Sequence, residues 1–461
     1  MPSPKLLQTV VEFPVLLPIS VAFARGGLRI HEFPVEQGRL PIGPQVTNLP
    51  HMPGPRYNRL VAHVAVGEAA MAPPVPSAGK ALAGFLLSGF LFALLGAVLP
   101  AWGYHRDPPE FTTIGNCFLS LAVGVIAAHQ VSAAILARKS LRFLLVFACA
   151  LGCAGLLSLA LATPPAHWLW RMPGLAALGL AVGLLNAGLF QAGAASYARE
   201  PARSAALGGI YYGLGSLAVT LLVAGTFYAY TVPVILILMA LAPAIFACMY
   251  ARAPVAEKAA VAHADLRQVL RDFRSLGAVL FALLLFFQFG NEWSIAGWLP
   301  LFLVRRLGIS PPASLGLLAL FWTALLVGRV AAVAILPKVR HSLLLGGSVL
   351  AALFGCVLLY RGSADNRSGV VAAMLLLGAG FASIYPLVAE KIGGRFPYYH
   401  PVFFSGIFSF ALFGGLIAPA TLGYAAAIWG IGIVVAVPLI GTCMVSALLL
   451  LIWLESKVMG R

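Results

Sequence analysis

LGAVLFALLLFFQFGNEWSIAGWLPLFL, residues 276–303, is the stretch of sequence that decides the fold class. It is apolar over almost its whole length, and a helix of about 20 apolar residues crosses the roughly 30 Å hydrocarbon core of a membrane. Glu292 is its only charged residue and lies near its middle. A charged side chain at that depth costs about 2.5–3.5 kcal/mol or more, so it must face water, contact a cation or keep its proton. The stretch predicts a transmembrane helix that carries a functional acid.

Eleven further apolar segments follow one another between residue 81 and the C-terminal end. Lipid offers no hydrogen-bond partners to the backbone, so each segment must be a helix. We therefore expect an all-α membrane protein with twelve transmembrane helices. The eleven segments lie near residues 81–104, 112–137, 141–162, 172–198, 204–228, 231–252, 313–336, 342–360, 369–390, 401–427 and 430–454.

The composition excludes several classes of protein. Of the 461 residues, 61% are hydrophobic and 10% are charged, whereas soluble domains have about 45–50% apolar and about 25% charged residues. A soluble enzyme and a disordered chain are thus excluded. The net charge of +16 comes from Lys and Arg clustered between the apolar segments, which is typical of membrane loops and not of a nucleic-acid-binding surface. The six cysteines form no CxxC pair, so we expect neither a metal site nor a cofactor.

The distribution of basic residues predicts the orientation in the membrane. Sixteen Lys and Arg residues lie in connections after even-numbered segments or at the C-terminus, and six lie in connections after odd-numbered segments. Because cytoplasmic loops carry the excess of basic residues, both ends of the chain are expected in the cytoplasm. We expect a multi-pass protein of a bacterial inner membrane.

The N-terminal part of the chain differs from the rest. Residues 1–75 are rich in proline, and their one apolar run is too short and too interrupted to span a membrane. We expect this extension to be unstructured. One hypothesis is that Met71 is the true start of the protein, because the residues that follow it, up to Lys80, resemble an ordinary short cytoplasmic lead into the first apolar segment.

An internal repeat divides the remaining chain into two halves of six segments each. Leu99-Pro100-Ala101-Trp102 aligns with Leu299-Pro300-Leu301-Phe302 at a shift of 200 residues, and His129 aligns with Arg329 at the same shift. We expect one six-helix bundle over 76–252, a cytoplasmic linker over 253–275 and a second bundle over 276–461. Parallel repeats of this kind place a binding cavity at the membrane midplane between the two bundles, which favours a transporter.

Four motifs in the second half carry a resemblance to a known family. They are Phe381-Ala-Ser-Ile-Tyr-Pro386, Gly328-Arg329, Phe413-Gly-Gly-Leu-Ile-Ala-Pro419 and Gly290-Asn-Glu-Trp293. Through them the chain resembles the major facilitator superfamily over about residues 81–455, and within it the fucose–proton symporter branch. The resemblance implies two pseudo-symmetric six-helix bundles and a sugar-type substrate. The acid that the branch carries in its first segment is Gly96 here, and its acid in the fourth segment falls near Asn186.

The candidate substrate-binding residues combine amides, an acid and aromatic rings. Gln288, Asn291 and Glu292 share one face of a helix, which is typical of a cavity lining. Glu292 is also the expected proton-coupling residue; the alternative is that it merely bonds to another helix. Aromatic side chains can stack on sugar rings while amides bond to the hydroxyl groups. The further candidates are Asn186, Tyr212, Trp322 and Tyr385.

Three other charged or titratable residues are expected to have gating or structural roles. Arg329 is expected to differ in depth from Glu292 by about 10–14 Å, counted at 1.5 Å per residue, which disfavours a direct ion pair. Glu390 is the nearer expected partner of Arg329. His129, which aligns with Arg329, is either a neutral side chain bonded within the bundle or a proton relay. Trp298 is expected to anchor the helix at the membrane interface.

These observations predict a secondary active transporter that works by alternating access. It would act as a monomer on a small polar solute, most plausibly a sugar or a sugar-like compound, with a proton or a sodium ion as the coupling ion. The alternatives are a drug or metabolite exporter of the same family and a non-transporting membrane sensor. No phosphate-binding GxxxxGK[ST] motif and no HExxH or GxSxG motif occurs, so an enzyme is not expected.

Overall fold

The structure is a computed structural model that describes residues 77–461 except for short gaps. The predicted N-terminal extension over 1–75, with Met71, lies outside the described residues, and so does most of the predicted linker over 253–275. Residues 74–461 form one compact unit. The gaps are 195, 197–199, 253–270, 272–273, 336–338, 364–365, 397–400 and 459–461.

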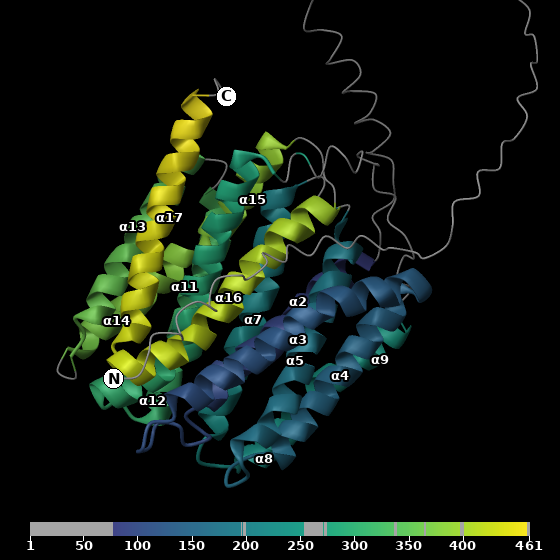
Figure 1. Cartoon of the computed structure of the whole chain (residues 1–461), viewed down its shortest axis with the longest axis vertical. Helices are drawn as coiled ribbons and strands as arrows, with labels where there is room; N and C mark the ends of the chain where they lie inside the picture. Colours follow the sequence, from purple (N-terminus) through teal and green to yellow (C-terminus); the bar gives the residue numbers. More distant parts are fainter. Residues whose placement is uncertain are drawn as a thin grey trace, which may run out of the picture. The chain divides into compact units, whose positions relative to one another are not determined.

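Helices account for nearly all of the described chain, as the apolar segments predict (Figure 1). The first half contains α2 (Ser77–Val98), α3 (Phe111–Arg138), α4 (Leu141–Leu161), α5 (Arg171–Ala192), α7 (Pro201–Thr226), α8 (Val232–Met239) and α9 (Leu241–Arg252). The second half contains α11 (Leu276–Leu307), α12 (Pro311–Ile335), α13 (His341–Tyr360), α14 (Arg367–Ala382), α15 (Ile384–Arg395), α16 (Pro401–Trp429) and α17 (Ile433–Val458).

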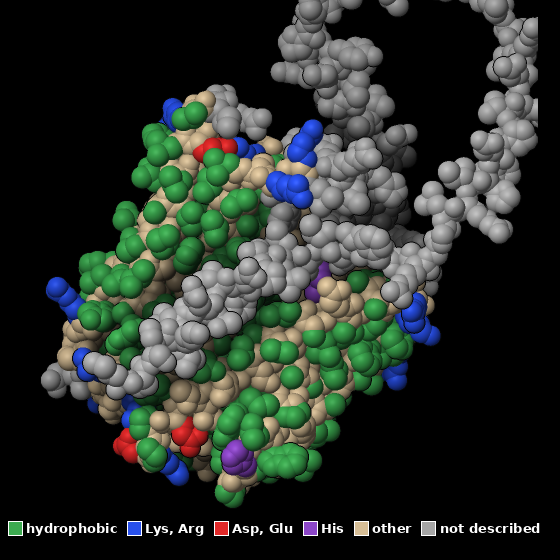
Figure 2. All heavy atoms as spheres, in the orientation of Figure 1, with side chains coloured by type: hydrophobic (Ala, Val, Ile, Leu, Met, Phe, Trp, Pro, Cys, Tyr) green, Lys and Arg blue, Asp and Glu red, His purple; other side chains and the backbone are tan. Residues whose placement is uncertain are grey.

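Eleven helical segments of the described chain are long and apolar enough to cross a membrane, and Leu82–Val98 is a shorter apolar helix. Many large hydrophobic side chains are exposed, among them Leu161, Leu343 and Ile428. Figure 2 shows that hydrophobic side chains cover much of the visible face of the helices, with charged side chains mostly near the helix ends. Such a surface matches lipid and not water. The chain is therefore a multi-pass membrane protein.

Two of the predicted segments are each divided into two helices. A proline lacks the backbone N–H, and its ring clashes with the carbonyl group four residues earlier. The helix α8 ends at Met239, four residues before Pro243, and α14 ends at Ala382, four residues before Pro386. The prolines therefore account for the position of both breaks.

Most helices pack against helices of the same half, such as α3 on α5 and α2 on α7 in the first half, or α11 on α16 in the second. Glycine permits some of these close approaches, as expected inside membranes. A Cβ atom at Gly179 would lie 2.0 Å from the carbonyl oxygen of Leu121, and one at Gly89 would lie 1.9 Å from that of Tyr212. Across the halves, α3 packs on α16, α7 on α12 and α2 on α11. Those contacts surround the candidate site.

Candidate functional site

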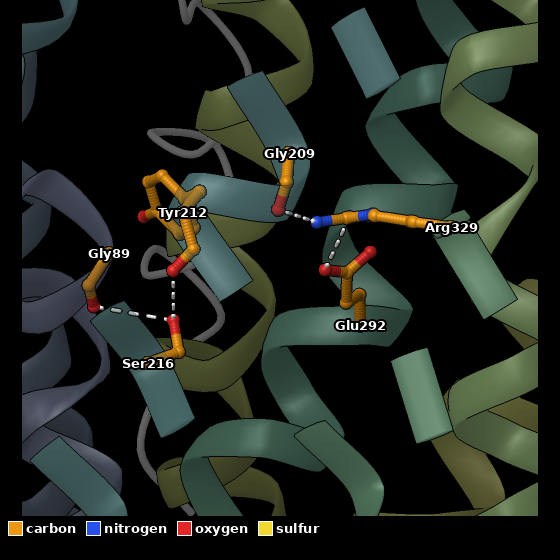
Figure 3. A network of polar contacts seen from close by, with 6 residues as sticks. All are labelled: Gly89, Gly209, Tyr212, Ser216, Glu292 and Arg329. Carbon is orange, nitrogen blue, oxygen red and sulfur yellow. Dashed lines mark hydrogen bonds and ion pairs between the residues drawn. The ribbon is translucent and has the colours of Figure 1, made fainter. Parts of the chain in front are cut away.

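The central feature is an ion pair between Glu292 of α11 and Arg329 of α12. Arg329 Nη2 lies 3.4 Å from Glu292 Oε1, and the two residues are 6% and 7% exposed, respectively. Arg329 Nη1 also donates a hydrogen bond of 2.5 Å to the backbone carbonyl oxygen of Gly209 on α7 (Figure 3). Glu292 and Arg329 belong to the second half, whereas Gly209 belongs to the first. One guanidinium group therefore joins the acid to the opposite half of the molecule.

The expectation that Arg329 lies too far from Glu292 for a direct pair is wrong. The expected depths were counted from the helix ends remote from the short connection between α11 and α12. The helix α11 has 32 residues, so it is longer than a membrane span requires. Counted from the connection, Glu292 lies 15 residues before the end of α11 and Arg329 lies 18 residues after the start of α12. The difference of about 4.5 Å is within the reach of an arginine side chain.

The absence of a side chain at Gly209 allows the guanidinium group to approach the backbone of α7. A Cβ atom at this position would lie 3.0 Å from Arg329 Nη1 and 3.1 Å from Arg329 Cζ. A carbonyl oxygen has two lone pairs, so it can accept this bond in addition to one within the helix. Gly209 thus belongs to the candidate site, although the sequence did not predict a role for it.

Four aromatic rings from four helices gather beside the ion pair. Phe92 of α2 and Tyr212 of α7 come from the first half, and Trp293 of α11 and Trp322 of α12 come from the second. The ring centroid of Trp293 lies 4.2 Å from that of Phe92, 5.7 Å from that of Tyr212 and 5.6 Å from that of Trp322. We call these four residues the aromatic cluster. The cluster brings the predicted binding residues Tyr212 and Trp322 together around Trp293. Stacking of these rings on a sugar stays a prediction.

Several buried polar groups on α11 and α12 have no hydrogen-bond partner among the described residues. Gln288 is 0% exposed, yet neither its Oε1 nor its Nε2 atom is bonded. Trp322 Nε1, on the aromatic cluster, and Ser294 Oγ are likewise buried and unpaired. Buried polar groups normally have a partner, and leaving one unpaired costs about 1–3 kcal/mol. Groups of this kind can bond to a polar ligand.

A small cavity lies between the halves beside the aromatic cluster. It is lined by residues of α2, α3, α11 and α16, among them Phe92, Gly96, Trp293 and Gly297, and has a volume of about 10 Å³. That is room for about one water molecule, so this cavity is too small to hold a sugar, and neither Glu292 nor Arg329 lines it.

Two predicted binding residues bond within their own halves. Asn186 of α5 accepts a hydrogen bond of 2.7 Å from Ser88 Oγ of α2. Asn291 donates one of 3.3 Å to Thr442 Oγ1 of α17. The structure therefore does not bring either amide to the ion pair. Asn291 and Glu292 are adjacent on α11, and the helix turns by about 100° between neighbours, so their side chains meet different helices.

Tyr385 belongs to a second group of rings. Its ring centroid lies 5.4 Å from that of Phe289 and 5.9 Å from that of Phe408, and Phe408 lies 4.5 Å from Phe190 of the first half. This group also crosses between the halves, through α5 and α16. Tyr385 thus contributes to a group of rings that includes Phe289, one turn before Trp293 on α11.

The remaining predicted residues do not contact Arg329. The expectation that Glu390 is its partner is wrong, because Glu390 Oε1 lies 3.2 Å from His341 Nδ1 and both side chains are partly exposed. His129 is half-buried on α3. Trp298 is not an interfacial anchor: it is 0% exposed and donates a hydrogen bond of 2.9 Å to the carbonyl oxygen of Pro419. No group of His, Cys, Asp and Glu side chains suited to a metal ion occurs in the described part of the chain.

A further contact between the halves, which the sequence did not predict, lies where α11 ends. Arg305 Nη1 donates hydrogen bonds of 3.1 Å and 3.0 Å to the carbonyl oxygens of His105 and Arg106, and Arg305 Nη2 lies 2.8 Å from Asp107 Oδ1. The connection 99–110 between α2 and α3 carries these acceptors. Arg305 thus holds the first half to the second at the end of the bundle where α11 ends.

Arg305→Gln should weaken this contact more than Asp107→Asn does. The Asp107 side chain is 85% exposed, and an exposed ion pair contributes only about 0–1 kcal/mol. Arg305 also donates to two backbone carbonyl groups, of which the bond to His105 is partly buried, and both bonds are lost only in Arg305→Gln. We expect a lower Tm for Arg305→Gln and a Tm near that of the wild type for Asp107→Asn. The exposed neighbour Arg306 supplies the matched control, Arg306→Gln; equal Tm values for all three variants would contradict the role of Arg305.

Solved structures similar to this one are transporters and not enzymes. The D-xylose–proton symporter has a TM-score of 0.64 and 15% sequence identity over 82% of this chain and 96% of that chain. The major facilitator superfamily transporter FucP, in its outward conformation, has a TM-score of 0.59 and 14% identity over 81% and 98%. The nucleoside transporter NupG has a TM-score of 0.59 and 13% identity over 83% and 100%. No protein-family model matches the sequence, and no curated protein matches it. The chain has the fold of the major facilitator superfamily.

Proposed function

We propose that this chain, with its major facilitator fold, is a secondary active transporter that moves a small polar solute by alternating access and couples the movement to protons. It acts as a monomer in a bacterial inner membrane, with both ends of the chain in the cytoplasm. One observation carries the proposal: Arg329 contacts the buried carboxylate of Glu292 and, at the same time, the backbone of Gly209 in the opposite half. The charge on Glu292 thereby influences a contact between the halves.

Proton uptake by Glu292 would change that contact. An ionised carboxylate attracts the Arg329 guanidinium, whereas a neutral carboxyl group attracts it far less. Arg329 cannot lose its own proton, so after protonation of Glu292 its charge must find another partner. The position of Arg329 between α11 and α7 therefore depends on the proton at Glu292. This dependence supports a proton as the coupling ion over sodium.

The chemistry around the ion pair favours a solute with a flat or ring-shaped apolar face and several hydroxyl groups. The aromatic cluster offers faces for stacking, and Gln288 and Trp322 offer unpaired hydrogen-bonding groups. A mostly apolar site with a few placed polar groups is typical of small-molecule binding. A sugar, or a sugar joined to a base, has this combination. The proteins similar in fold include transporters of xylose and of nucleosides, which supports the same class.

Uptake by purified protein in liposomes tests this function directly. We expect radiolabelled pentoses, hexoses or nucleosides to accumulate when the exterior is one pH unit more acidic than the interior. With one proton per solute, this gradient supports an accumulation of up to about tenfold, because 1.4 kcal/mol corresponds to a factor of ten. A sodium gradient at equal pH is the control. Uptake of no solute under either gradient would contradict the proposal.

A second candidate function is export of an organic cation. Four aromatic rings beside a buried carboxylate also suit a cationic ligand, because the ring faces attract positive charge. The same liposomes separate the two functions: an exporter would release a preloaded organic cation in exchange for protons and would not accumulate sugars.

A further inference from the structure

A second buried arginine lies in the first half, away from the ion pair. Arg171 is the first residue of α5 and is 5% exposed. Its guanidinium carbon lies 5.4 Å from the ring centroid of Trp102 and 5.4 Å from that of Tyr104. The two aromatic residues belong to the connection 99–110 and are 6% and 7% exposed. The two rings are 6.4 Å apart and nearly perpendicular, so Arg171 contacts both.

The hydrogen-bond donors in this group greatly outnumber the acceptors. Arg171 Nη2 donates to the carbonyl oxygen of Ala166 at 3.3 Å. Arg171 Nε and Nη1, Trp102 Nε1 and the Tyr104 hydroxyl are buried without a hydrogen-bond partner among the described residues. A guanidinium and an indole can donate hydrogen bonds but cannot accept them. Only a ligand with several hydrogen-bond acceptors, or with a negative charge, can bond to all of these unpaired donors.

The charge of Arg171 also lacks a counter-charge. Ion pairs in the described part of the chain use other basic residues, and Asp107, on the same connection, is paired with Arg305. Glu110 is exposed just before α3, and the thiol of Cys117 lies near the Tyr104 hydroxyl. A buried charge is strongly unfavourable unless it is paired. The positive end of the 22-residue helix α5 adds to the same potential.

The Tyr104 hydroxyl is a donor whose side-chain neighbour is the thiol of Cys117, which is only a weak acceptor. Burial raises the pKa of Tyr104 well above its usual value, so the hydroxyl keeps its proton at neutral pH. The positively charged guanidinium of Arg171 is thus accompanied by two uncharged hydrogen-bond donors, Trp102 Nε1 and the Tyr104 hydroxyl.

We propose that Arg171, Trp102 and Tyr104 form a binding site for a small anion, either chloride or a single carboxylate group. The site lies within the first half and uses none of the residues of the Glu292–Arg329 site. Its occupant bonds to both the connection 99–110 and the start of α5. Since Arg305 of the second half is bonded to the same connection, anion binding stabilises the part of the first half that Arg305 holds.

Thermal unfolding of the purified full-length protein tests the site. In sodium gluconate, replacement of gluconate by chloride at constant ionic strength should raise the Tm in a saturable way. A parallel titration with acetate identifies the source: stabilisation by acetate but not by chloride assigns the site to a carboxylate group. Arg171→Gln should lose the stabilisation, and Arg306→Gln, which changes an exposed arginine, should keep it.

A milder variant keeps the test decisive if Arg171→Gln does not fold. Tyr104→Phe removes one hydrogen bond to the anion, which should raise the half-saturating concentration about tenfold. Unsaturable stabilisation in the wild type, or equal stabilisation of wild type and Tyr104→Phe, would overturn the proposal. Saturable stabilisation by an anion that occurs in Glu110→Gln but not in the wild type would also overturn the proposal. In that case the carboxylate of Glu110, and not an added anion, would occupy the site in the wild type. None of these outcomes depends on transport activity.

Discussion

Glu292→Gln should abolish proton-driven accumulation of the solute while it leaves exchange of solute across the membrane measurable. The amide keeps the size of the side chain but can neither take up nor release a proton. Without that step, a pH gradient cannot drive solute transport, so the accumulation ratio should fall from up to about tenfold, for a one-unit gradient, to one. Exchange needs only the movement between the two access states, which does not consume the gradient.

Two measurements on liposomes separate coupling from folding. Accumulation is followed under an imposed pH gradient, and exchange is followed as the loss of preloaded labelled solute into medium that contains unlabelled solute. Glu200→Gln is the matched control, because Glu200 is an exposed acid paired with Arg203 and lies outside the site. Normal accumulation by Glu292→Gln would contradict the coupling role, and loss of both activities would indicate a structural one.

The second large effect is a difference in stability between variants of the ion pair: we expect Glu292→Gln to destabilise the protein more than Arg329→Gln does. Glu292→Gln leaves the buried guanidinium of Arg329 without its carboxylate, and removing one partner of a buried pair costs about 3–5 kcal/mol. Arg329→Gln leaves the carboxyl group of Glu292, which can become neutral by binding a proton, whereas a guanidinium group cannot become neutral by losing one. Arg329→Gln should therefore lower the free energy of unfolding less than Glu292→Gln does, and least at acidic pH.

A double-mutant cycle measures this asymmetry. The Tm of each single variant and of the double variant Glu292→Gln/Arg329→Gln is recorded at pH 5 and at pH 8. The double variant holds no buried charge at this position, so we expect it to be more stable than Glu292→Gln alone. Additive effects of the two substitutions at both pH values would show that the residues do not interact in the folded protein.

The sequence alone is enough to identify Glu292 as a candidate, and it also holds the information that places Arg329 near it. Glu292 was identified because a lone acid in a long apolar run is costly in lipid. A count from the outer ends of α11 and α12 places Arg329 at a different depth, whereas a count from the connection that the two helices share places it close to Glu292. The breaks before Pro243 and Pro386 could not be predicted from proline alone, because Pro300, Pro419 and Pro438 lie inside helices that continue unbroken.

The sequence gives no indication of which neighbouring helix each side chain of α11 contacts. Asn291 and Glu292 are neighbours, yet one bonds to Thr442 and the other to Arg329. Which helix each meets depends on how α11 is rotated within the bundle. The apolar residues occur all round these helices, so a hydrophobic period cannot report that rotation. The same reason explains why Trp298, expected at the interface, is buried against Pro419.

The sequence by itself determined that the chain crosses a membrane as helices, because lipid leaves the backbone no other way to satisfy its hydrogen bonds. It also singled out Glu292 as the one acid of a long apolar helix, and the structure shows this side chain buried. Only the tertiary structure decided which groups surround that acid: Arg329, the backbone of Gly209 and rings from both halves. Such contacts depend on the rotation and crossing of helices far apart in sequence, which close packing sets and composition does not.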